Sequence, residues 1–143
     1  MATTTATISL ASSDIADNTM SISNTATLTT AGTDTGMSKT TGLSRVTTTD
    51  DSNIVIFDSY TGGAGSTNIG VEQIVKGKFF IKNLNARGDG SKYVTVLQGT
   101  VEIGRLYGGD WMFCPWQGGA GNDIEITPLA GTTYILEYIL FYE

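Results

Sequence analysis

The residue types that most enzymes use for acid–base and nucleophilic chemistry are scarce in this chain of 143 residues. Histidine is absent, which excludes Ser-His-Asp triads, Cys-His dyads and imidazole metal ligands. The single cysteine, Cys114, excludes a disulfide framework within the chain and any site with several cysteine ligands. Since Cys114 lies between Phe113 and Pro115 and has no histidine partner, we expect a buried small hydrophobe and not a nucleophile.

Carboxylates are the remaining candidates for general acid–base work of the glycosidase type, and the candidates are Glu102, Asp110, Glu125 and Glu137. Glu102 and Glu125 alternate with aliphatic residues, which is typical of the solvent-facing side of a strand. We therefore expect them to make the surface soluble. The sequence predicts that the protein is not an enzyme and that it holds no cofactor.

Two segments match ligand-binding loops in part. Residues 118–123 match the first six positions of the calcium-binding nonapeptide G-G-x-G-x-D, but Glu125 stands where an aliphatic residue belongs. Gly77 and Lys78 lack the upstream glycine of a phosphate-binding loop. We expect ordinary loops here and predict no metal site.

The elements that carry these residues fall into two parts of different composition. Every aromatic residue lies at or after Phe57, and residues 1–53 are dominated by Thr and Ser. Burial of so little apolar surface can barely offset the entropic cost of ordering the backbone, which is roughly 1–2 kcal/mol per residue. Apolar and polar residues alternate at 8–10, 20–22 and 26–28, which favours short strands.

We interpret residues 1–53 as an extended Thr/Ser-rich N-terminal arm that becomes ordered on a neighbour. A short repeat, Thr-Gly-Met-Ser at 35–38 and Thr-Gly-Leu-Ser at 41–44, places one apolar side chain after each glycine. It is either a chance feature of a Thr/Gly-rich stretch or a pair of anchors. The predicted partner-binding anchors of the arm are Met20, Ile22, Leu28, Met37 and Leu43.

Residues 54–143 indicate one all-β domain. Short strands are predicted at 54–57, 71–82 (broken at Gly77), 93–97, 100–103, 111–114 (ended by Pro115), 123–127 and 132–142. No segment has convincing helical periodicity. The pattern is typical of an antiparallel β-sandwich or a jelly-roll-like domain.

The last predicted strand is apolar on both faces. An oligomer interface would explain this, as would simple burial in the core. The residues of the proposed interface share one face, namely Tyr134, Leu136, Tyr138, Leu140 and Tyr142.

Basic and aromatic residues supply further docking candidates. Lys76, Lys78 and Lys82 share one strand face, which is either a stripe that docks on an acidic partner or a solvated face that protects a sheet edge. Trp111 and Trp116 are placed to stack on a sugar, to anchor a protein contact or to pack at a strand end.

Charge and hydropathy exclude other partners. A net charge of −6 gives the chain no electrostatic reason to bind nucleic acid. No run approaches the roughly 18 apolar residues of a membrane helix. The start of the chain lacks the features of a signal peptide, and the lone cysteine suggests synthesis in a reducing cytoplasm.

Residues 99–125 loosely resemble a cupin-like barrel, but without histidines that resemblance implies β-barrel topology at most. Four other stretches resemble small virion proteins of tailed bacteriophages: TATLTTAGTDTG (25–36), GKFFIKNLN (77–85), EIGRLYGGDWMF (102–113) and TTYILEYILFYE (132–143). The plan of a compact β-domain with an extended arm is similar to that of capsid decoration (cement) proteins, which are often trimeric.

This resemblance implies a non-enzymatic protein on the capsid surface of a virion, made in the host cytoplasm. It would clamp adjacent copies of the major capsid protein and self-associate, as a trimer by analogy with the family. The alternatives are a tail, neck or fibre adaptor of a phage and a carbohydrate-binding β-sandwich module that uses Trp111, Trp116 or nearby tyrosines.

Overall fold

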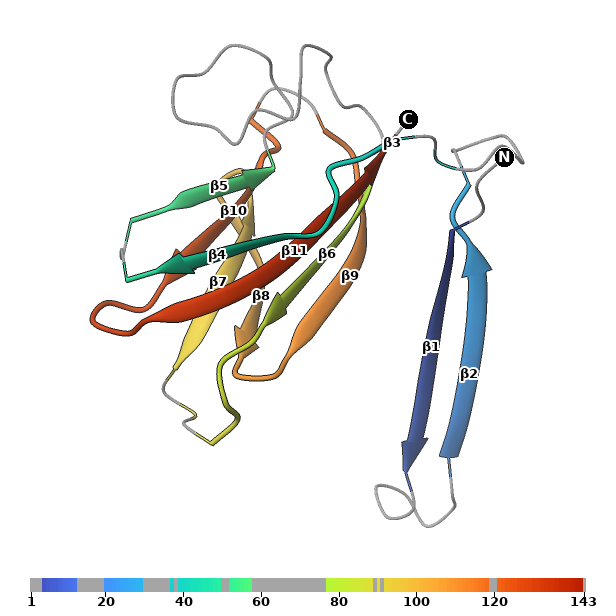
Figure 1. The fold of residues 1–143 in the computed structure, drawn as a ribbon, viewed down its shortest axis with the longest axis horizontal. Coiled ribbons are helices and arrows are strands. Elements are labelled where there is room, and N and C mark those ends of the chain that lie inside the picture. Colours follow the sequence, from blue (N-terminus) through green and yellow to red (C-terminus); the bar gives the residue numbers. More distant parts are fainter. Residues whose placement is uncertain are drawn as a thin grey trace. The chain divides into compact units, whose positions relative to one another are not determined.

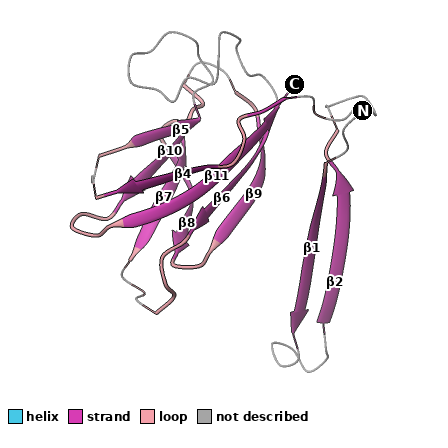
Figure 2. Ribbon diagram, viewed as in Figure 1, coloured by secondary structure: helices cyan, strands magenta, loops and turns pink. Residues whose placement is uncertain are grey.

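The structure is a computed structural model that describes residues 4–12, 20–29, 37, 39–49, 52–57, 77–88, 90, 92–118 and 121–142. All regular elements among these residues are β-strands (Figure 2). The chain divides into two compact units, residues 1–38 and 39–143. The predicted all-β class is therefore confirmed.

The first unit contains a hairpin of β1 (Thr5–Ser12) and β2 (Met20–Thr27), labelled in Figure 1. The two strands are antiparallel, and their register runs from Thr5 opposite Thr27 to Ser12 opposite Met20 without a shift. The alternation seen at 8–10 and 20–28 thus belongs to two strands of one hairpin.

The second unit contains two antiparallel sheets. Its strands are β3 (Lys39–Thr40), β4 (Ser44–Thr48), β5 (Ile54–Phe57), β6 (Gly77–Asn83), β7 (Tyr93–Gln98), β8 (Val101–Tyr107), β9 (Trp111–Trp116), β10 (Ile124–Pro128) and β11 (Tyr134–Tyr142). One sheet has the order β5-β10-β7-β8. The other has the order β3-β11-β6-β9, and β4 also pairs with β11.

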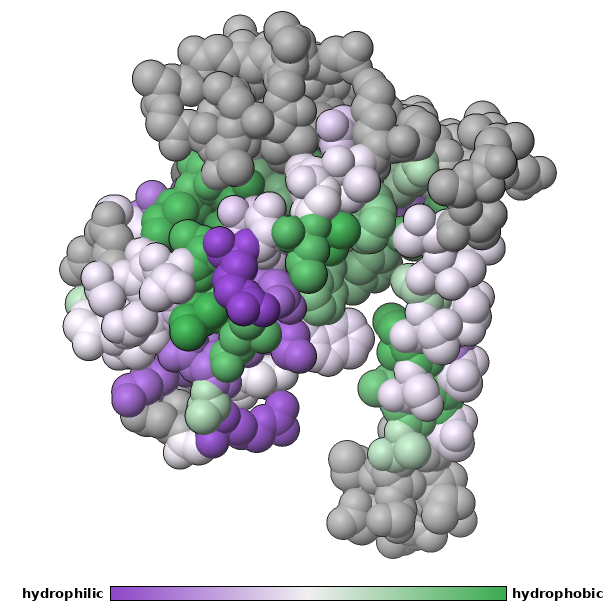
Figure 3. Space-filling model, viewed as in Figure 1, coloured by the Kyte–Doolittle hydropathy of each residue, from purple (hydrophilic) through white to green (hydrophobic). Residues whose placement is uncertain are grey.

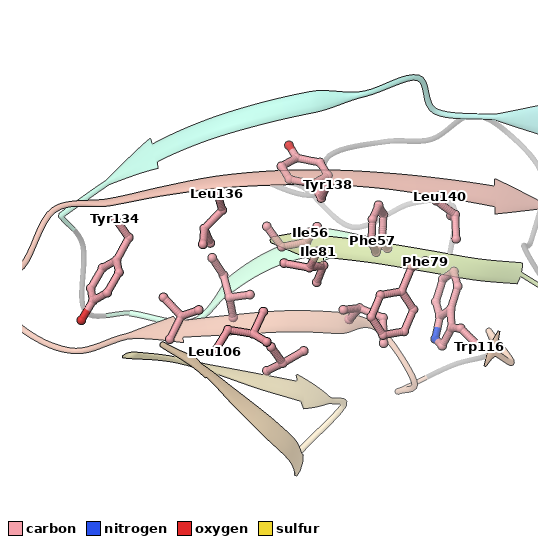
Figure 4. Packing of buried hydrophobic residues seen from close by; sticks show 14 residues of the cluster. Ile56, Phe57, Phe79, Ile81, Leu106, Trp116, Tyr134, Leu136, Tyr138 and Leu140 are labelled. Atoms are coloured by element: carbon pink, nitrogen blue, oxygen red, sulfur yellow. The ribbon is translucent and has the colours of Figure 1, made fainter. Parts of the chain in front are cut away.

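The two sheets pack face to face as a β-sandwich, and alternate residues of their strands fill the space between them. Burial alternates strictly along β6 and β10, as the period of two requires. Ile124 and Ile126 are both fully buried, so they share the core-facing side of β10, within the strand predicted at 123–127. Figure 4 shows the cluster between the ribbons.

Aromatic rings join the sheets at one end of this core. Phe57 from β5 lies 6.0 Å from the ring of Phe79, 6.3 Å from that of Trp116 and 5.6 Å from that of Tyr138. The three neighbours all belong to the opposite sheet. Offset and edge-on pairs of this kind stabilise a core by about 0.5–1.5 kcal/mol each beyond area burial.

The boundary between the units differs from the predicted one. Composition places residues 39–53 in the arm, whereas β3 and β4 pair with β11 and belong to the second unit. Val46 packs against the core, and the Arg45 guanidinium donates to the Glu137 carboxylate across the β4–β11 pair. A strand that covers an edge needs backbone pairing and few large side chains, which is why the scarcity of aromatic residues was misleading.

Pro115 does not end its strand as predicted, because β9 continues to Trp116. Proline lacks an N–H donor, so it is tolerated in a strand that pairs on only one side. Among the described residues β9 pairs with β6 and with no other strand, so it is such an edge strand. Of the strand predicted at 71–82, the structure describes the part from Gly77 onward as β6.

Two glycines are required by close approaches of the backbone. Gly99 in the turn between β7 and β8 has a φ of 57°, and a Cβ there would lie 2.1 Å from the carbonyl oxygen of Gly121. A Cβ on Gly108 would lie 2.3 Å from the carbonyl oxygen of Ala86. Any larger residue at either position would push two loops apart.

Candidate partner-binding surfaces

The β1–β2 hairpin has one apolar face and one hydroxyl-rich face. Its register places Ala6, Ile8, Leu10, Ile22, Asn24 and Ala26 on one side and Thr5, Thr7, Ser9, Ala11, Ser21, Ser23, Thr25 and Thr27 on the other. Ile8, Leu10 and Ile22 are 37%, 50% and 48% exposed. Figure 3 shows hydrophobic groups among near-neutral ones along this hairpin.

The hydrogen-bonding phase of the hairpin shows which backbone groups point outward. The amide of Leu28 donates to the carbonyl oxygen of Thr4 at 2.9 Å, which marks this pair as hydrogen-bonded. Because hydrogen-bonded and non-hydrogen-bonded pairs alternate, Ser9 and Ser23 form a non-hydrogen-bonded pair. The same holds for Thr7 and Thr25, whose hydroxyl oxygens lie 2.9 Å apart and share a hydrogen bond. The outward amides and carbonyls therefore belong to the hydroxyl-rich residues.

Nothing within these two strands blocks the addition of another strand. Residues 4–12 and 20–29 contain no charged residue and no proline, and the ladder has no bulge. Sheet edges are normally protected by such features. Residues 4–12 and 20–27 therefore form a pair of uncharged strands, and one face of the pair is mainly apolar, with Asn24 as a polar member.

Three edge strands of the sandwich, β5, β8 and β9, are different. β8 has a register shift opposite Val96 and Leu97 and carries the Glu102–Arg105 ion pair of 2.9 Å. β9 contains Pro115, and the pairing of β5 shifts at Ile124. Each of these three edges thus has a feature that hinders further pairing.

The predicted arm anchors fall in different places. Ile22 lies on the apolar face of the hairpin, Leu28 is buried and Met37 is half-buried. Leu43 is exposed but belongs to the second unit, just before β4. Met20 begins β2, and its side chain lies outside the described part.

Sequence reasoning missed Ile8 and Leu10 as members of this face. Their alternation with Ser9 was visible, but only a defined register places them beside Ile22. Leu10 lies directly opposite Ile22 across the hairpin.

The final strand β11 uses its aromatic and leucine face inside the molecule. Tyr134, Leu136 and Leu140 are fully buried, Tyr138 is nearly so, and half-buried Tyr142 packs against the same cluster. The interface expected on this face is therefore wrong, and the alternative of core burial holds. The reason is that β11 is central in its sheet and faces the other sheet (Figure 4).

The structure places the lysine and tryptophan residues predicted for docking in different environments. Lys78 and Lys82 share the outer face of β6, as the period of two predicts, but β6 lies between β11 and β9 and is not an edge. Lys76 lies outside the described residues. Trp116 is buried, and its indole Nε1 donates to the carbonyl oxygen of Asn122 at 2.7 Å, whereas Trp111 is 50% exposed.

A cavity of about 320 Å³ lies beside Trp111, between β8 and β9. Arg87 and Asp110 also line it, and their side chains form an ion pair of 3.2 Å. The second carboxylate oxygen of Asp110 accepts a hydrogen bond from the amide of Tyr107. An exposed indole beside a charged donor and acceptor can stack on a sugar ring and bind its hydroxyls.

The carboxylates considered for catalysis are all engaged in polar contacts. Glu102 pairs with Arg105, Glu137 with Arg45 and Asp110 with Arg87. Glu125 accepts a hydrogen bond of 2.9 Å from the side-chain amide of Asn53. Each of these carboxylates is thus engaged with a basic or amide side chain at the surface.

Burial raises the pKa of the Cys114 thiol, which lowers its thiolate fraction and its reactivity.

The part of the chain that the structure describes contains no group of three or more acidic or cysteine residues placed to hold a metal ion. The described residues include no helix, and therefore no helix that is long and apolar enough to cross a membrane. Comparison of the chain with family models, curated proteins and solved structures found no match.

Proposed function

We propose that this protein is a non-enzymatic structural component of a virion, which acts as a cement that clamps adjacent major capsid proteins. The observation that supports the proposal most is the β1–β2 hairpin, whose two strands contain no charged residue and no proline and expose Ile8, Leu10 and Ile22 on one face. A two-stranded hairpin is marginally stable in water by itself. Its burial against a neighbour would stabilise both partners.

The work of such a protein is thermodynamic. Contacts made only with the assembled shell stabilise that shell by mass action, and no catalytic group is needed. The backbone edges of β1 and β2 would supply hydrogen bonds by strand addition, and Ile8, Leu10 and Ile22 would supply apolar contacts. The sandwich would supply bulk outside the shell.

Binding to shells that lack the protein tests this function. The full chain should bind such shells and raise the temperature at which they dissociate, whereas residues 39–143 should fold and fail to bind. These residues form a compact unit with its own core, so the shortened chain is a fair comparison. Equal binding by both chains would exclude the clamping role of the hairpin.

Copy number distinguishes the tail, neck or fibre alternative. Electron cryomicroscopy of the particle that carries this chain should show hundreds of copies on the capsid surface. A handful of copies at one vertex or along the tail would favour the adaptor role.

The Trp111 cavity favours a second candidate function, which is carbohydrate binding. The half-exposed indole lies beside Arg87 and Asp110, within reach of a sugar's hydroxyl groups. A glycan array should then give signals that Trp111→Ala removes and Trp111→Phe retains in part. An array without signals, or with signals unchanged in Trp111→Ala, would exclude this site.

A further inference from the structure

The five-stranded sheet carries large apolar side chains on its outer face as well as in the core. Even residues of β6 and odd residues of β9 and β11 point away from the core, because their neighbours in each strand pack into it. The outward apolar residues are Phe80, Trp111, Phe113, Ile135, Ile139 and Phe141. The outer face of an antiparallel sheet is normally polar, so such a set indicates a contact surface.

Strand pairing arranges these side chains in rows across the sheet. One row is apolar, with Phe113 opposite Phe80 and Phe80 opposite Ile139. The next row crosses β9, β6, β11 and β4 in the order Trp111, Lys82, Glu137 and Arg45. The five-stranded sheet lies in front of the other sheet in Figure 1, and Figure 3 shows hydrophobic and hydrophilic groups side by side on it.

The outer face of the four-stranded sheet is different. One of its outward rows consists of Thr127, Thr95 and Arg105. Hydroxyl groups and a charge are typical of a sheet face that meets water. This contrast within one sandwich identifies the five-stranded sheet as the contact face.

We infer that this outer face is a self-association surface, through which two copies of the chain pack their five-stranded sheets face to face. The two-fold axis would run along the strands, midway between β6 and β11. Such an axis keeps the position of each residue along the strands but places β6 of one copy over β11 of the other. Phe80 then lies over Ile139 of the second copy, and Lys82 lies over Glu137 of the second copy.

Charge complementarity supports a second copy as the occupant. Lys82 and Glu137 are directly opposite each other in the sheet, so a partner surface of one sign would meet a like charge at one of them. A second copy matches both, because the axis places each lysine over a carboxylate.

The same axis exchanges β9 with β4 and places Trp111 over Arg45 of the second copy. The Trp111 side chain is 50% exposed, and the Arg45 side chain, which pairs with Glu137, is 61% exposed. A guanidinium over the face of an indole is a favourable contact. The row of four residues is thus complementary to itself along its whole length.

Charge-reversal variants test the inference on the purified full chain, without any shell. Lys82→Glu brings carboxylates together across the interface, and Glu137→Lys brings ammonium groups together. Sedimentation equilibrium should show a two-copy species for the wild type and association weaker by about tenfold or more for either variant alone. An equimolar mixture of the two variants should regain a two-copy species, because each reversed charge then faces an opposite one.

Lys92→Glu and Glu125→Lys are the matched controls, because they change the net charge equally but lie in or next to the four-stranded sheet. Both should associate as the wild type does. Recovery in the mixture is a result that a disturbed fold cannot produce, since each variant keeps its own substitution.

A neutral variant decides the case in which charge reversal unfolds the chain, since Lys82 and Glu137 are also neighbours within one sheet. Phe80→Thr removes a ring from the apolar row and leaves the core and the charges in place, and Leu97→Thr on the outer face of the other sheet is its control. Selective loss of association in Phe80→Thr supports the inference.

A monomeric wild type, a three-copy species, no recovery in a mixture of folded variants, or equal effects of the two threonine variants would overturn the inference. Because no shell is present, this outcome is independent of the clamping function.

Discussion

The side-chain amide of Asn83 at the end of β6 donates a hydrogen bond to the carbonyl oxygen of Leu106 in β8, 3.1 Å away. The two residues belong to opposite sheets, and Asn83 is the buried polar residue of the described core. Its side-chain oxygen accepts from the amide of Asn85, and its backbone exchanges hydrogen bonds with Gly109 and Asp110. Asn83 thus ties three segments together at one end of the sandwich.

Replacing Asn83 with leucine should lower the free energy of unfolding by about 1–3 kcal/mol, because the carbonyl of Leu106 and the amide of Asn85 lose their partner inside the protein. Urea denaturation followed by tryptophan fluorescence measures this change. Thr100→Ala, at an exposed turn position, is the control and should change little. Full stability of Asn83→Leu would contradict the role assigned to these bonds.

Phe57→Ala should cost about 3–5 kcal/mol of stability, since it opens a cavity among the rings of Phe79, Trp116 and Tyr138. Phe57→Leu refills much of that volume and should cost clearly less. The same denaturation experiment compares the two variants. If they are equally destabilised, volume at this position does not determine the packing of the two sheets.

Tyr134→Phe is expected to leave the protein as stable as the wild type or more stable. The hydroxyl of Tyr134 is buried and has no hydrogen-bond partner among the described residues. A buried polar group without a partner costs about 1–3 kcal/mol, and phenylalanine keeps the ring while it removes that group. A lower melting temperature for Tyr134→Phe in calorimetry would show that the hydroxyl makes a stabilising contact.

The free energy of unfolding should decrease at alkaline pH, and Cys114 should contribute to this decrease. Burial raises the pKa of its thiol in the folded state, so the folded chain holds this proton more tightly than the unfolded chain. The protonated thiol therefore contributes fully to stability below the pKa of an unfolded cysteine, about 8.5. This contribution is lost as the pH rises through the higher pKa of the folded state. Urea denaturation between pH 7 and 10 should therefore show a shallower decline for Cys114→Ala than for the wild type.

Tyr138 acts in the same direction at higher pH, because burial also raises the pKa of its phenol. Tyr138→Phe combined with Cys114→Ala should flatten the alkaline decline further. If the double variant declines as steeply as the wild type, other groups determine the alkaline loss of stability.

The sequence determined the class of the fold because its information is local. The alternation at 124–126 and the Gly99 turn each predict a strand or a turn from a few neighbouring residues. The absence of histidine and the single cysteine likewise follow from composition. The predicted strands and turns indicated an antiparallel β-sandwich, and the structure has one.

Only the tertiary structure decided which surfaces are free, because burial depends on pairing between distant segments. β11 is apolar on both faces, but its order in the sheet determines that Tyr134 and Leu140 lie in the core. The register of the hairpin brings Leu10 and Ile22 together on an exposed face, although the sequence predicted only Ile22 as an anchor. A period of two shows which residues share a face, and the partner strand determines what that face meets.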